Sequence, residues 1–214
     1  MEFIEQDLQK YVVSHTEAEN PLLQEINRET HVNVLRPRML SGHLQGRMLS
    51  MLSHMIKPSN ILEIGTYTGY SALCLAEGLQ PGGKLITIEV NEELEERIKR
   101  NFAASVYDHQ IELKIGNATD IIPRLSFQWD LVFIDADKAN YLQYYEMVID
   151  HVPKGRFIIV DNVLWSGKVL EKYRSKVDKD TEAILAFNEK VHRDDRVSNV
   201  LFPVRDGIMI LRKN

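Results

Sequence analysis

Apolar and polar residues alternate along the middle of the chain in a pattern typical of a parallel sheet. Short runs rich in Ile, Leu and Val predict five strands, at Asn60–Ile64, Lys84–Glu89, Ile111–Ile115, Asp130–Ile134 and Arg156–Val160. Helix-like segments follow the first four strands, at Tyr70–Leu79, Glu92–Ser105 (with Asn91 as the expected N-cap), Ala118–Leu125 and Asn140–His151. This alternation predicts parallel strands with helices on both faces of the sheet.

The end of the chain has a different pattern. Thr181–Asp194 predicts a helix, and Val197–Phe202 and Gly207–Arg212 predict two further strands. The link between these two strands is too short for a helical crossover, so the pair is expected to be antiparallel. The pattern therefore predicts an α/β fold with a mixed sheet of seven strands.

The N-terminal part shows helical patterns only, at Glu2–Ser14, Pro21–Thr30 and Ser41–Met55. We expect a single domain over 1–214, in which 1–58 is a helical extension and 59–214 is the core. The extension is too amphipathic to fold by itself, so it packs on the sheet edge, caps the site or meets a partner subunit. The polar, lysine-rich segment Ser166–Lys179 is expected to be a mobile loop.

Composition excludes several classes of protein. The chain has 214 residues, 44% of them hydrophobic and 27% charged, as in an average globular protein. A net charge of −5 disfavours a broad nucleic-acid-binding surface. Cys74 is the only cysteine, which excludes an intrachain disulfide and a Cys-rich zinc site. There is no apolar run of about 18 residues and no secretory pattern at the start, so no membrane span and a cytoplasmic location are expected.

The first strand ends in a glycine-containing turn, Gly65-Thr66-Tyr67-Thr68-Gly69, before a helix begins. Such a turn is found in many α/β folds, and alone it is weak evidence for a ligand. Glu89, at the end of the second strand, is placed to bind ribose hydroxyls. Glu63, two residues before the turn, would repel a pyrophosphate and favour a cation. With no G-x-G-x-x-G pattern, the segment indicates a positively charged nucleoside ligand such as S-adenosylmethionine.

Acidic and amide residues follow two neighbouring strands. Asp135 ends the fourth strand, and Asp161 and Asn162 end the fifth. Ligands of parallel sheets bind at the carboxyl ends of strands, so these side chains are expected to converge. Their oxygens suit Mg²⁺ or another hard divalent cation such as Mn²⁺ or Ca²⁺. The alternative is that each Asp caps the helix after it.

Lys138 lies three residues after Asp135. A lysine beside a divalent cation and a sulfonium suits a general base, because both positive charges disfavour its protonated form. The alternative is a salt bridge to Asp135 or Asp137. Trp165 is either a flat wall for an aromatic substrate or a packing residue. One further set of cations either attracts an anionic substrate, such as a CoA thioester or RNA, or is solvated: Lys168, Lys172, Arg174, Lys176 and Lys179.

Several segments together resemble the cation-dependent O-methyltransferases, the family of catechol and caffeoyl-CoA O-methyltransferases and their bacterial relatives. These segments are ILEIGTYTGYS, ITIEVNEE, GNATDIIPRL, DLVFIDADKANY, DNVLWSG and DGIMILRK. The resemblance covers the chain from about Glu17 to Arg212. It implies a Rossmann-like three-layer sandwich with a reversed last strand, S-adenosylmethionine as cofactor, and a homodimer.

The resemblance also implies roles for individual residues. The implied cofactor contacts are Met39, Ser41, Glu63, Gly65, Thr66, Ser71, Glu89, Ala118, Asp135 and Asp137. The implied metal ligands are Asp135, Asp161 and Asn162, the implied base is Lys138, and the candidate substrate contacts are Trp165 and Ser166. Gly42-His43-Leu44 replaces a more acidic stretch of the plant members, and Ala136-Asp137 lacks the aromatic gatekeeper of the animal catechol enzyme. Both departures leave the acceptor open.

The leading hypothesis is therefore a Mg²⁺-dependent O-methyltransferase that acts on a vicinal dihydroxy aromatic such as a catechol or caffeoyl compound. An alternative keeps the chemistry and takes 5-hydroxyuridine of tRNA as acceptor, a reading that the net charge disfavours. A non-catalytic module that binds a nucleoside cofactor is a third possibility, against which the lysine and metal set counts. A dehydrogenase is disfavoured by Glu63 and by the missing G-x-G-x-x-G pattern.

Overall fold

The structure is a computed structural model that describes residues 5–173 and 178–214. The chain divides into two compact units, Ile4–Ala118 and Thr119–Asn214. We call them the first and the second unit. The described residues form seven strands of one mixed sheet, as the sequence pattern predicts.

The first unit carries a three-stranded parallel segment in the order β3-β2-β1. Its helices and strands are α1 (Gln6–Ser14), α2 (Pro21–Asn33), α3 (Gly42–Ile56), β1 (Asn60–Ile64), α4 (Tyr70–Ala76), β2 (Lys84–Glu89), α5 (Glu95–Ala103) and β3 (Ile111–Ile115). Its 3₁₀ turns are η1 (Pro37–Met39), η2 (Glu92–Leu94) and η3 (Asp108–Gln110).

The second unit carries four strands in the order β4-β5-β7-β6. Its helices and strands are α6 (Ala118–Ile121, whose first residue closes the first unit), β4 (Leu131–Ile134), α7 (Tyr141–Val148), β5 (Phe157–Asp161), α8 (Lys179–His192), β6 (Val197–Phe202) and β7 (Ile208–Lys213). Its 3₁₀ turns are η4 (Ile122–Arg124), η5 (Lys138–Asn140), η6 (Ile149–His151), η7 (Trp165–Gly167) and η8 (Glu171–Tyr173). Strand β4 pairs with β5 in parallel, whereas β7 is antiparallel to both β5 and β6. The predicted reversal of the last strand is confirmed.

Helix ends are where the structure departs from the sequence prediction. The helix predicted over 118–125 is α6 followed by the 3₁₀ turn η4, because Pro123 lacks an N–H donor and cannot continue an α-helix. The helix predicted over 92–105 also begins as a 3₁₀ turn, with Asn91 as its N-cap as predicted. The segment predicted as a mobile loop contains η8 and the last two residues of η7. Its residues 174–177 lie outside the described part, as do the first residues of the helix predicted from Glu2.

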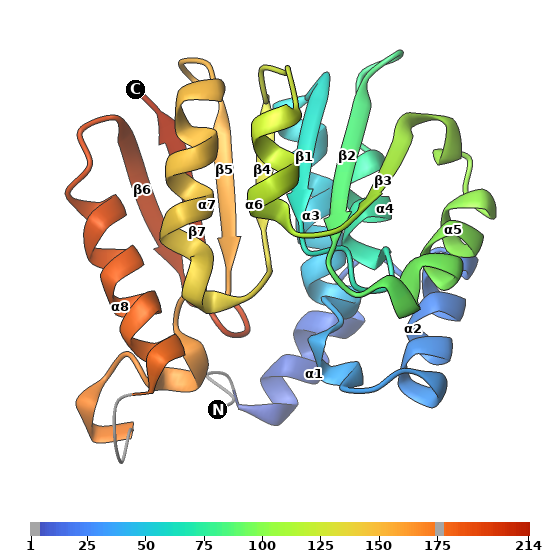
Figure 1. Ribbon diagram of the computed structural model, residues 1–214. Coiled ribbons are helices and arrows are strands. Elements are labelled where there is room, and N and C mark those ends of the chain that lie inside the picture. The colour runs from blue at the N-terminus through green and yellow to red at the C-terminus, as the bar shows by residue number, and fades with distance from the viewer. Residues whose placement is uncertain (1–4, 174–177) are drawn as a thin grey trace. The chain divides into compact units, whose positions relative to one another are not determined.

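Strand residues are buried in a way that explains the near-continuous apolar runs of the sequence. All four residues of β4 are buried, and so are four of the five in β1 and in β5. Helices α7 and α8 contact each other and lie side by side in front of the strands of the second unit (Figure 1). In the first unit, α3 packs on α4, and the thiol of Cys74 is buried there. Cys74 therefore has a packing role.

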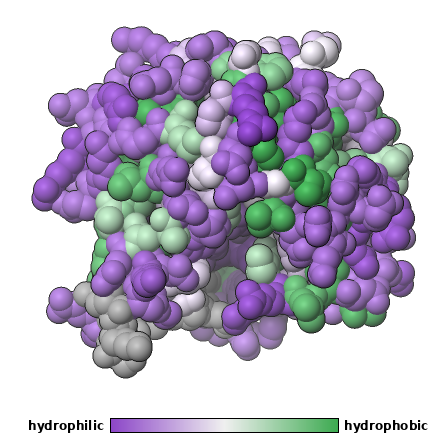
Figure 2. All heavy atoms as spheres, viewed as in Figure 1, coloured by the Kyte–Doolittle hydropathy of each residue, from purple (hydrophilic) through white to green (hydrophobic). Residues whose placement is uncertain are grey.

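The face seen in Figure 2 carries mainly hydrophilic side chains, with hydrophobic residues in small separate groups. Exposed apolar side chains that occur singly are normal for globular proteins. No helix among the described residues is long and apolar enough to cross a membrane.

Candidate active site

The glycine turn of the first unit adopts backbone conformations that its residues explain. Gly65 and Gly69 have positive φ angles of 99° and 85°, which glycine adopts at little cost. A Cβ atom at Gly69 would lie 2.6 Å from the ring of Phe102, so this position also needs glycine for space. Tyr67, between them, has a φ of 53°, which is uncommon for a residue with a large side chain. The turn thus presents a fixed backbone just before α4.

Glu89 is held at this turn by backbone donors. Its Oε2 accepts a hydrogen bond from the N–H of Tyr67 at 2.7 Å, and its Oε1 accepts one from the N–H of Asn91 at 2.9 Å. The residue is 7% exposed. Each carboxylate oxygen keeps further acceptor capacity. Glu89 can therefore accept hydrogen bonds from a pair of ligand hydroxyls, which is the role predicted for it.

Glu63 lies beneath the turn and is fully buried. The hydroxyl of Thr87 donates to its Oε2 at 2.5 Å, and the hydroxyls of Thr66 and Thr87 are also 2.5 Å apart. The three side chains form one buried network that links strand β1 to the turn. A direct contact of Glu63 with a cofactor stays a prediction, whereas its carboxyl group lies close below the turn in any case.

Met39 and Ser41, two of the predicted cofactor contacts, follow α2. Ser41 is 7% exposed and precedes α3, whereas Met39 is 54% exposed. The hydroxyl of Tyr67 donates to the carbonyl oxygens of Leu35 and Arg36, at 3.0 and 3.3 Å. The glycine turn is therefore tied directly to the segment that leads to Met39. The two other predicted contacts, Ser71 in the first turn of α4 and Ala118 at the start of α6, are nearly buried.

In the second unit, Lys138 brings two predicted metal ligands together. Its Nζ lies 3.2 Å from Oδ1 of Asp135 and 2.7 Å from Oδ1 of Asn162. It also donates to the carbonyl oxygen of Ala136 at 2.9 Å and contacts the hydroxyl of Tyr141 at 2.5 Å. Lys138 is 8% exposed. An ammonium thus lies among four oxygens that come from two strand ends and one helix.

Asp161, the third predicted ligand, is 3% exposed. Its Oδ1 accepts a hydrogen bond from the N–H of Asn162 at 2.7 Å, and its carbonyl oxygen accepts one from Tyr141 at 3.0 Å. Asn162 has a positive φ of 61°, a conformation that asparagine tolerates better than most residues. Burial, and then the charges of Asp135 and Asp161, raise the pKa of Tyr141 well above its ordinary value, so this hydroxyl stays protonated.

These residues fit a hard divalent cation in donor chemistry. The ammonium of Lys138 is a stand-in cation, and its contacts show that oxygens of Asp135 and Asn162 already converge on a positive charge. Within residues 5–173 and 178–214, no group of three His, Cys, Asp or Glu side chains could hold a metal. The predicted set has only two carboxylates and an amide, so water or substrate oxygens would have to complete the coordination.

Trp165 and Ser166 lie on a strained turn after β5. Both have positive φ angles, 47° and 53°. The turn is held by the link between β6 and β7, because Leu164 donates to the carbonyl oxygen of Asp206 and the N–H of Ser166 donates to its carboxylate. The Trp165 ring lies 5.8 Å from Nζ of Lys138. The structure thus places this ring beside the predicted base.

Asp137, a predicted cofactor contact, is held by its own helix. The hydroxyl of Tyr144 donates to Oδ1 at 2.5 Å, and the amide of Asn140 donates to Oδ2 at 2.6 Å. Among the basic residues of the 168–179 segment, Lys168 forms an ion pair with Asp178 at 2.8 Å, while Arg174 and Lys176 lie outside the described residues.

Comparison with known proteins decides the family. The sequence profile of the O-methyltransferase family matches residues 13–214.

The chain belongs to the O-methyltransferase family.

Individual relatives agree with this assignment. The O-methyltransferase described here is 32% identical to a probable caffeoyl-CoA O-methyltransferase of Dictyostelium discoideum, over 95% of this chain and 90% of the relative. It is similar to the crystal structure of an O-methyltransferase from Bacillus cereus in complex with S-adenosylhomocysteine, with a TM-score of 0.88, 29% identity and 97% of both chains covered. An O-methyltransferase of tomaymycin synthesis from Streptomyces achromogenes, solved with S-adenosylmethionine, gives a TM-score of 0.89, 27% identity and coverage of 99% and 100%. The predicted family and Rossmann-like fold are confirmed.

Two residues of this O-methyltransferase, Tyr141 and Thr87, contact predicted site residues and were not themselves predicted from the sequence. Tyr141 contacts Lys138 and follows it by three positions, the spacing at which side chains meet on a helix, so a signal was present. Thr87 is the one hydroxyl in the middle of an apolar strand, and the register places it directly beside Glu63. A polar residue at such a buried position indicates a specific partner.

Proposed function

We propose that this O-methyltransferase transfers a methyl group from S-adenosylmethionine to a hydroxyl of a vicinal dihydroxy aromatic compound, such as a catechol or a caffeoyl derivative, with a divalent cation. The observation that carries the proposal is the convergence of Asp135, Asn162 and Lys138 at neighbouring strand ends. The oxygens that would hold the cation therefore contact the nitrogen of the candidate base directly.

The first unit supplies the residues that would hold the cofactor. When bound, S-adenosylmethionine supplies an electrophilic methyl group on a sulfonium. Glu89 would accept hydrogen bonds from the ribose hydroxyls. The charge of Glu63 would favour the sulfonium, and Met39 and Ser41 would cover the methionine part. The S-adenosylmethionine and S-adenosylhomocysteine in the two related structures support this assignment.

The second unit supplies the residues for the acceptor. Asp135, Asp161 and Asn162 would hold the divalent cation, which when bound acidifies an acceptor hydroxyl and neutralises the carboxylates. Two adjacent hydroxyls of a catechol suit a cation that has open coordination positions. The ring of Trp165 would lie against the aromatic acceptor. Relatives named as caffeoyl-CoA O-methyltransferases support this substrate class.

Lys138 would act as the base in its neutral form. Nζ of Lys138 would accept the proton of the acceptor hydroxyl as the acceptor oxygen takes the methyl group, and the electron pair of the carbon–sulfur bond would stay on the sulfur of the bound cofactor. The hydrogen bonds to Ala136 and Tyr141 hold Nζ in place without using the predicted metal ligands. Alignment of the reacting groups then contributes much of the rate.

We also propose that the two units work as one methyltransferase domain.

We further propose that the protein is a homodimer. Helix α1 has no buried residue, and it exposes the apolar side chains of Leu8 and Tyr11, at 52% and 60%. Covering them would remove apolar surface from water. Light scattering on the purified protein tests this point, and a monomer at micromolar concentration would contradict it.

The central experiment is an acceptor screen with labelled S-adenosylmethionine and Mg²⁺, repeated with EDTA. We expect methylation of catechol-type compounds that falls at least tenfold on chelation and returns with added Mg²⁺ or Mn²⁺. Activity that is indifferent to chelation would refute the metal role. A sample of tRNA containing 5-hydroxyuridine serves as a parallel acceptor, and methylation of the tRNA alone would replace the aromatic acceptor class.

A further inference from the structure

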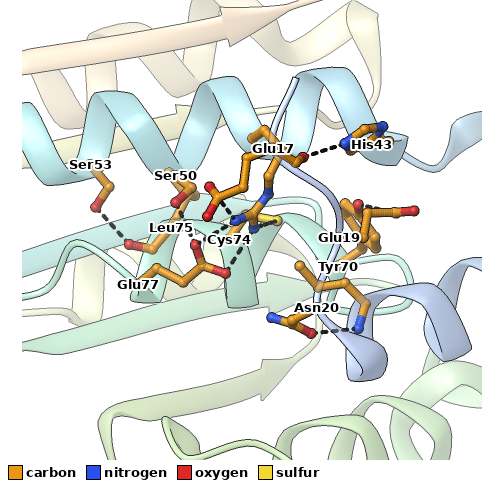
Figure 3. Close-up of polar contacts among 12 residues, drawn as sticks. Glu17, Glu19, Asn20, His43, Ser50, Ser53, Tyr70, Cys74, Leu75 and Glu77 are labelled. Carbon is orange, nitrogen blue, oxygen red and sulfur yellow. Dashed lines mark hydrogen bonds and ion pairs between the residues drawn. The ribbon is translucent and has the colours of Figure 1, made fainter. Parts of the chain in front are cut away.

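A buried polar cluster joins α3 to α4 in the first unit (Figure 3). We call Arg47, Ser50, Cys74 and Glu77 the α3–α4 cluster. Arg47 forms a two-pronged ion pair with Glu77, with N–O distances of 3.0 and 2.8 Å. The hydroxyl of Ser50 donates to the same carboxylate at 2.5 Å, and Arg47 also contacts Sγ of Cys74 at 3.6 Å. The cluster therefore fixes the two helices by directional contacts.

The ion pair is taken largely out of water. The side chains of Arg47 and Glu77 are 9% and 13% exposed. Nε of Arg47 is buried and has no hydrogen-bond partner among the described residues. Buried ion pairs contribute little net stability compared with apolar residues of the same volume, because desolvation offsets the attraction. A gain in stability therefore does not explain why this ion pair is present. The pair does fix the position of α3 relative to α4.

The contacts also show that α3 and α4 run in the same direction. Gly46 of α3 lies against Tyr70 and Cys74, where an added Cβ would come within 2.5 Å of the Tyr70 ring. Further along both helices, the hydroxyl of Ser53 donates to the carbonyl oxygen of Leu75 at 2.6 Å. Residue numbers therefore increase in the same direction along the two helices. The N-terminal ends of α3 and α4 lie at the same end of the pair.

These two ends carry the two loops that would hold the methionine part of the cofactor. Ser41 directly precedes α3, and Ser71 lies in the first turn of α4, after the glycine turn. Arg47 lies five residues after Gly42, or about 8 Å along the helix axis. A shift of α3 along α4 would therefore move Met39 and Ser41 relative to the glycine turn.

The link between α1 and α2 reinforces the same arrangement (Figure 3). The carbonyl oxygen of Glu17 lies 2.6 Å from Nε2 of His43 at the start of α3, and the carboxylate of Glu17 lies 3.8 Å from Arg47. The hydroxyl of Tyr70 donates to Glu19 at 2.5 Å. One short segment thus contacts the starts of both helices.

We propose that Arg47 and Glu77 are positioning residues for the S-adenosylmethionine site, which set the position of the Met39–Ser41 segment relative to the glycine turn. The inference rests on the proposed function. It predicts that loss of the ion pair weakens binding of the methionine part of the cofactor and leaves binding of the nucleoside part, at Glu89, unchanged.

The test is calorimetry with S-adenosylmethionine and with adenosine on the wild-type protein and on Arg47→Met/Glu77→Leu, which keeps apolar volume between the helices. We expect the Kd for S-adenosylmethionine to rise about tenfold, since small displacements of a binding group have effects of this order. The Kd for adenosine should stay within about twofold. In turnover, KM for the cofactor should rise while kcat is kept. A matched control is Glu95→Gln/Lys99→Gln, which removes an exposed ion pair on α5.

Two results would overturn the inference: unchanged affinity for both ligands, or equal loss of affinity for both, which would indicate general loosening of the unit. If the double variant does not fold, Arg47→Lys decides, because it keeps the charge and loses the two-pronged geometry. It must then show the same selective loss for the inference to stand. A wild-type protein that binds no S-adenosylmethionine would instead overturn the proposed function, and the inference with it.

Discussion

The carboxylates of the two units are held in different ways. Around the glycine turn, Glu89 accepts hydrogen bonds from backbone N–H groups and Glu63 accepts one from a threonine hydroxyl, and these donors are neutral. At the strand ends of the second unit, Asp135 instead faces the ammonium of Lys138. Neutral donors fix a carboxylate and leave its charge in place for a ligand. An ammonium neutralises the carboxylate and can be exchanged for another cation.

The nucleoside side of the proposed site is preformed, whereas the acceptor side is not. The nucleoside side keeps its shape without a ligand, because Glu89 and Glu63 accept hydrogen bonds from backbone groups and hydroxyls of the same unit. The acceptor side carries an internal cation whose partners, Asp135 and Asn162, are also the proposed metal ligands. Variants on the two sides should therefore differ in what they change: cofactor affinity on one side and turnover on the other.

The largest effect is expected for Lys138→Ala. Loss of a general base lowers turnover by about 10²–10⁴-fold, while the Kd for S-adenosylmethionine should change little because Lys138 is not among the predicted cofactor contacts. Steady-state turnover with a catechol acceptor and calorimetry with the cofactor measure the two quantities. Lys190→Ala is the control, because this lysine pairs with Glu146 at the surface. Wild-type turnover by Lys138→Ala would remove this lysine from the mechanism.

Glu89→Gln should weaken binding of the cofactor in the first unit. The variant keeps one acceptor oxygen and loses the charge, so we expect the Kd for both S-adenosylmethionine and adenosine to rise by about 10–100-fold. kcat at saturating cofactor should fall much less. Glu112→Gln, on the neighbouring strand β3, is the control, since its carboxylate pairs with Lys84 and Lys114. Unaltered nucleoside affinity in Glu89→Gln would contradict the ribose assignment.

Asp194→Asn tests whether a carboxylate of the second unit outside the site affects stability alone. Asp194 accepts hydrogen bonds from Arg196 at 2.7 Å and Tyr145 at 3.0 Å, and the bond from Arg196 holds its pKa below the usual range. We expect a loss of about 1 kcal/mol in unfolding free energy at pH 7, with turnover unchanged. Because the folded pKa is the lower one, the stabilisation is complete above the unfolded value of about 4 and is lost as pH falls through the folded value. Denaturant unfolding at pH 7 and pH 3 should thus show the difference between the variant and the wild type shrinking in acid; a constant difference would contradict the linkage.

Cys74 should show the smallest effect, namely none in the native state. Burial raises the pKa of its thiol to about 12, so very little thiolate exists at pH 8. A thiol reagent should leave native protein unmodified at that pH and react promptly in guanidinium chloride. Cys74 lies in the α3–α4 cluster, so rapid reaction in the native state would mean that the helix pair opens readily.

The local sequence pattern was sufficient to predict most helices and strands and the types of residue at the proposed site. The strand β2 occupies the residues that its apolar run predicts, and the short link before β7 made its antiparallel pairing a geometric necessity. Local pattern failed where non-local contacts act. The positive φ angles at Trp165 and Ser166 are held by residues 206–207, some 40 positions later, so no local signal predicts that turn.

The α/β fold, the reversed last strand, the glycine turn and the acidic strand ends follow from the amino-acid sequence alone, because hydrophobic period, loop length and residue type are local properties. Tertiary packing sets three further contacts: Lys138 lies between Asp135 and Asn162, Thr87 and Thr66 link Glu63 to the turn, and Arg47 pairs with Glu77 between two helices. Each of these contacts joins segments whose distance in space depends on how strands pair and helices pack, and side-chain hydrogen bonds form only when that distance is right to within a few tenths of an ångström.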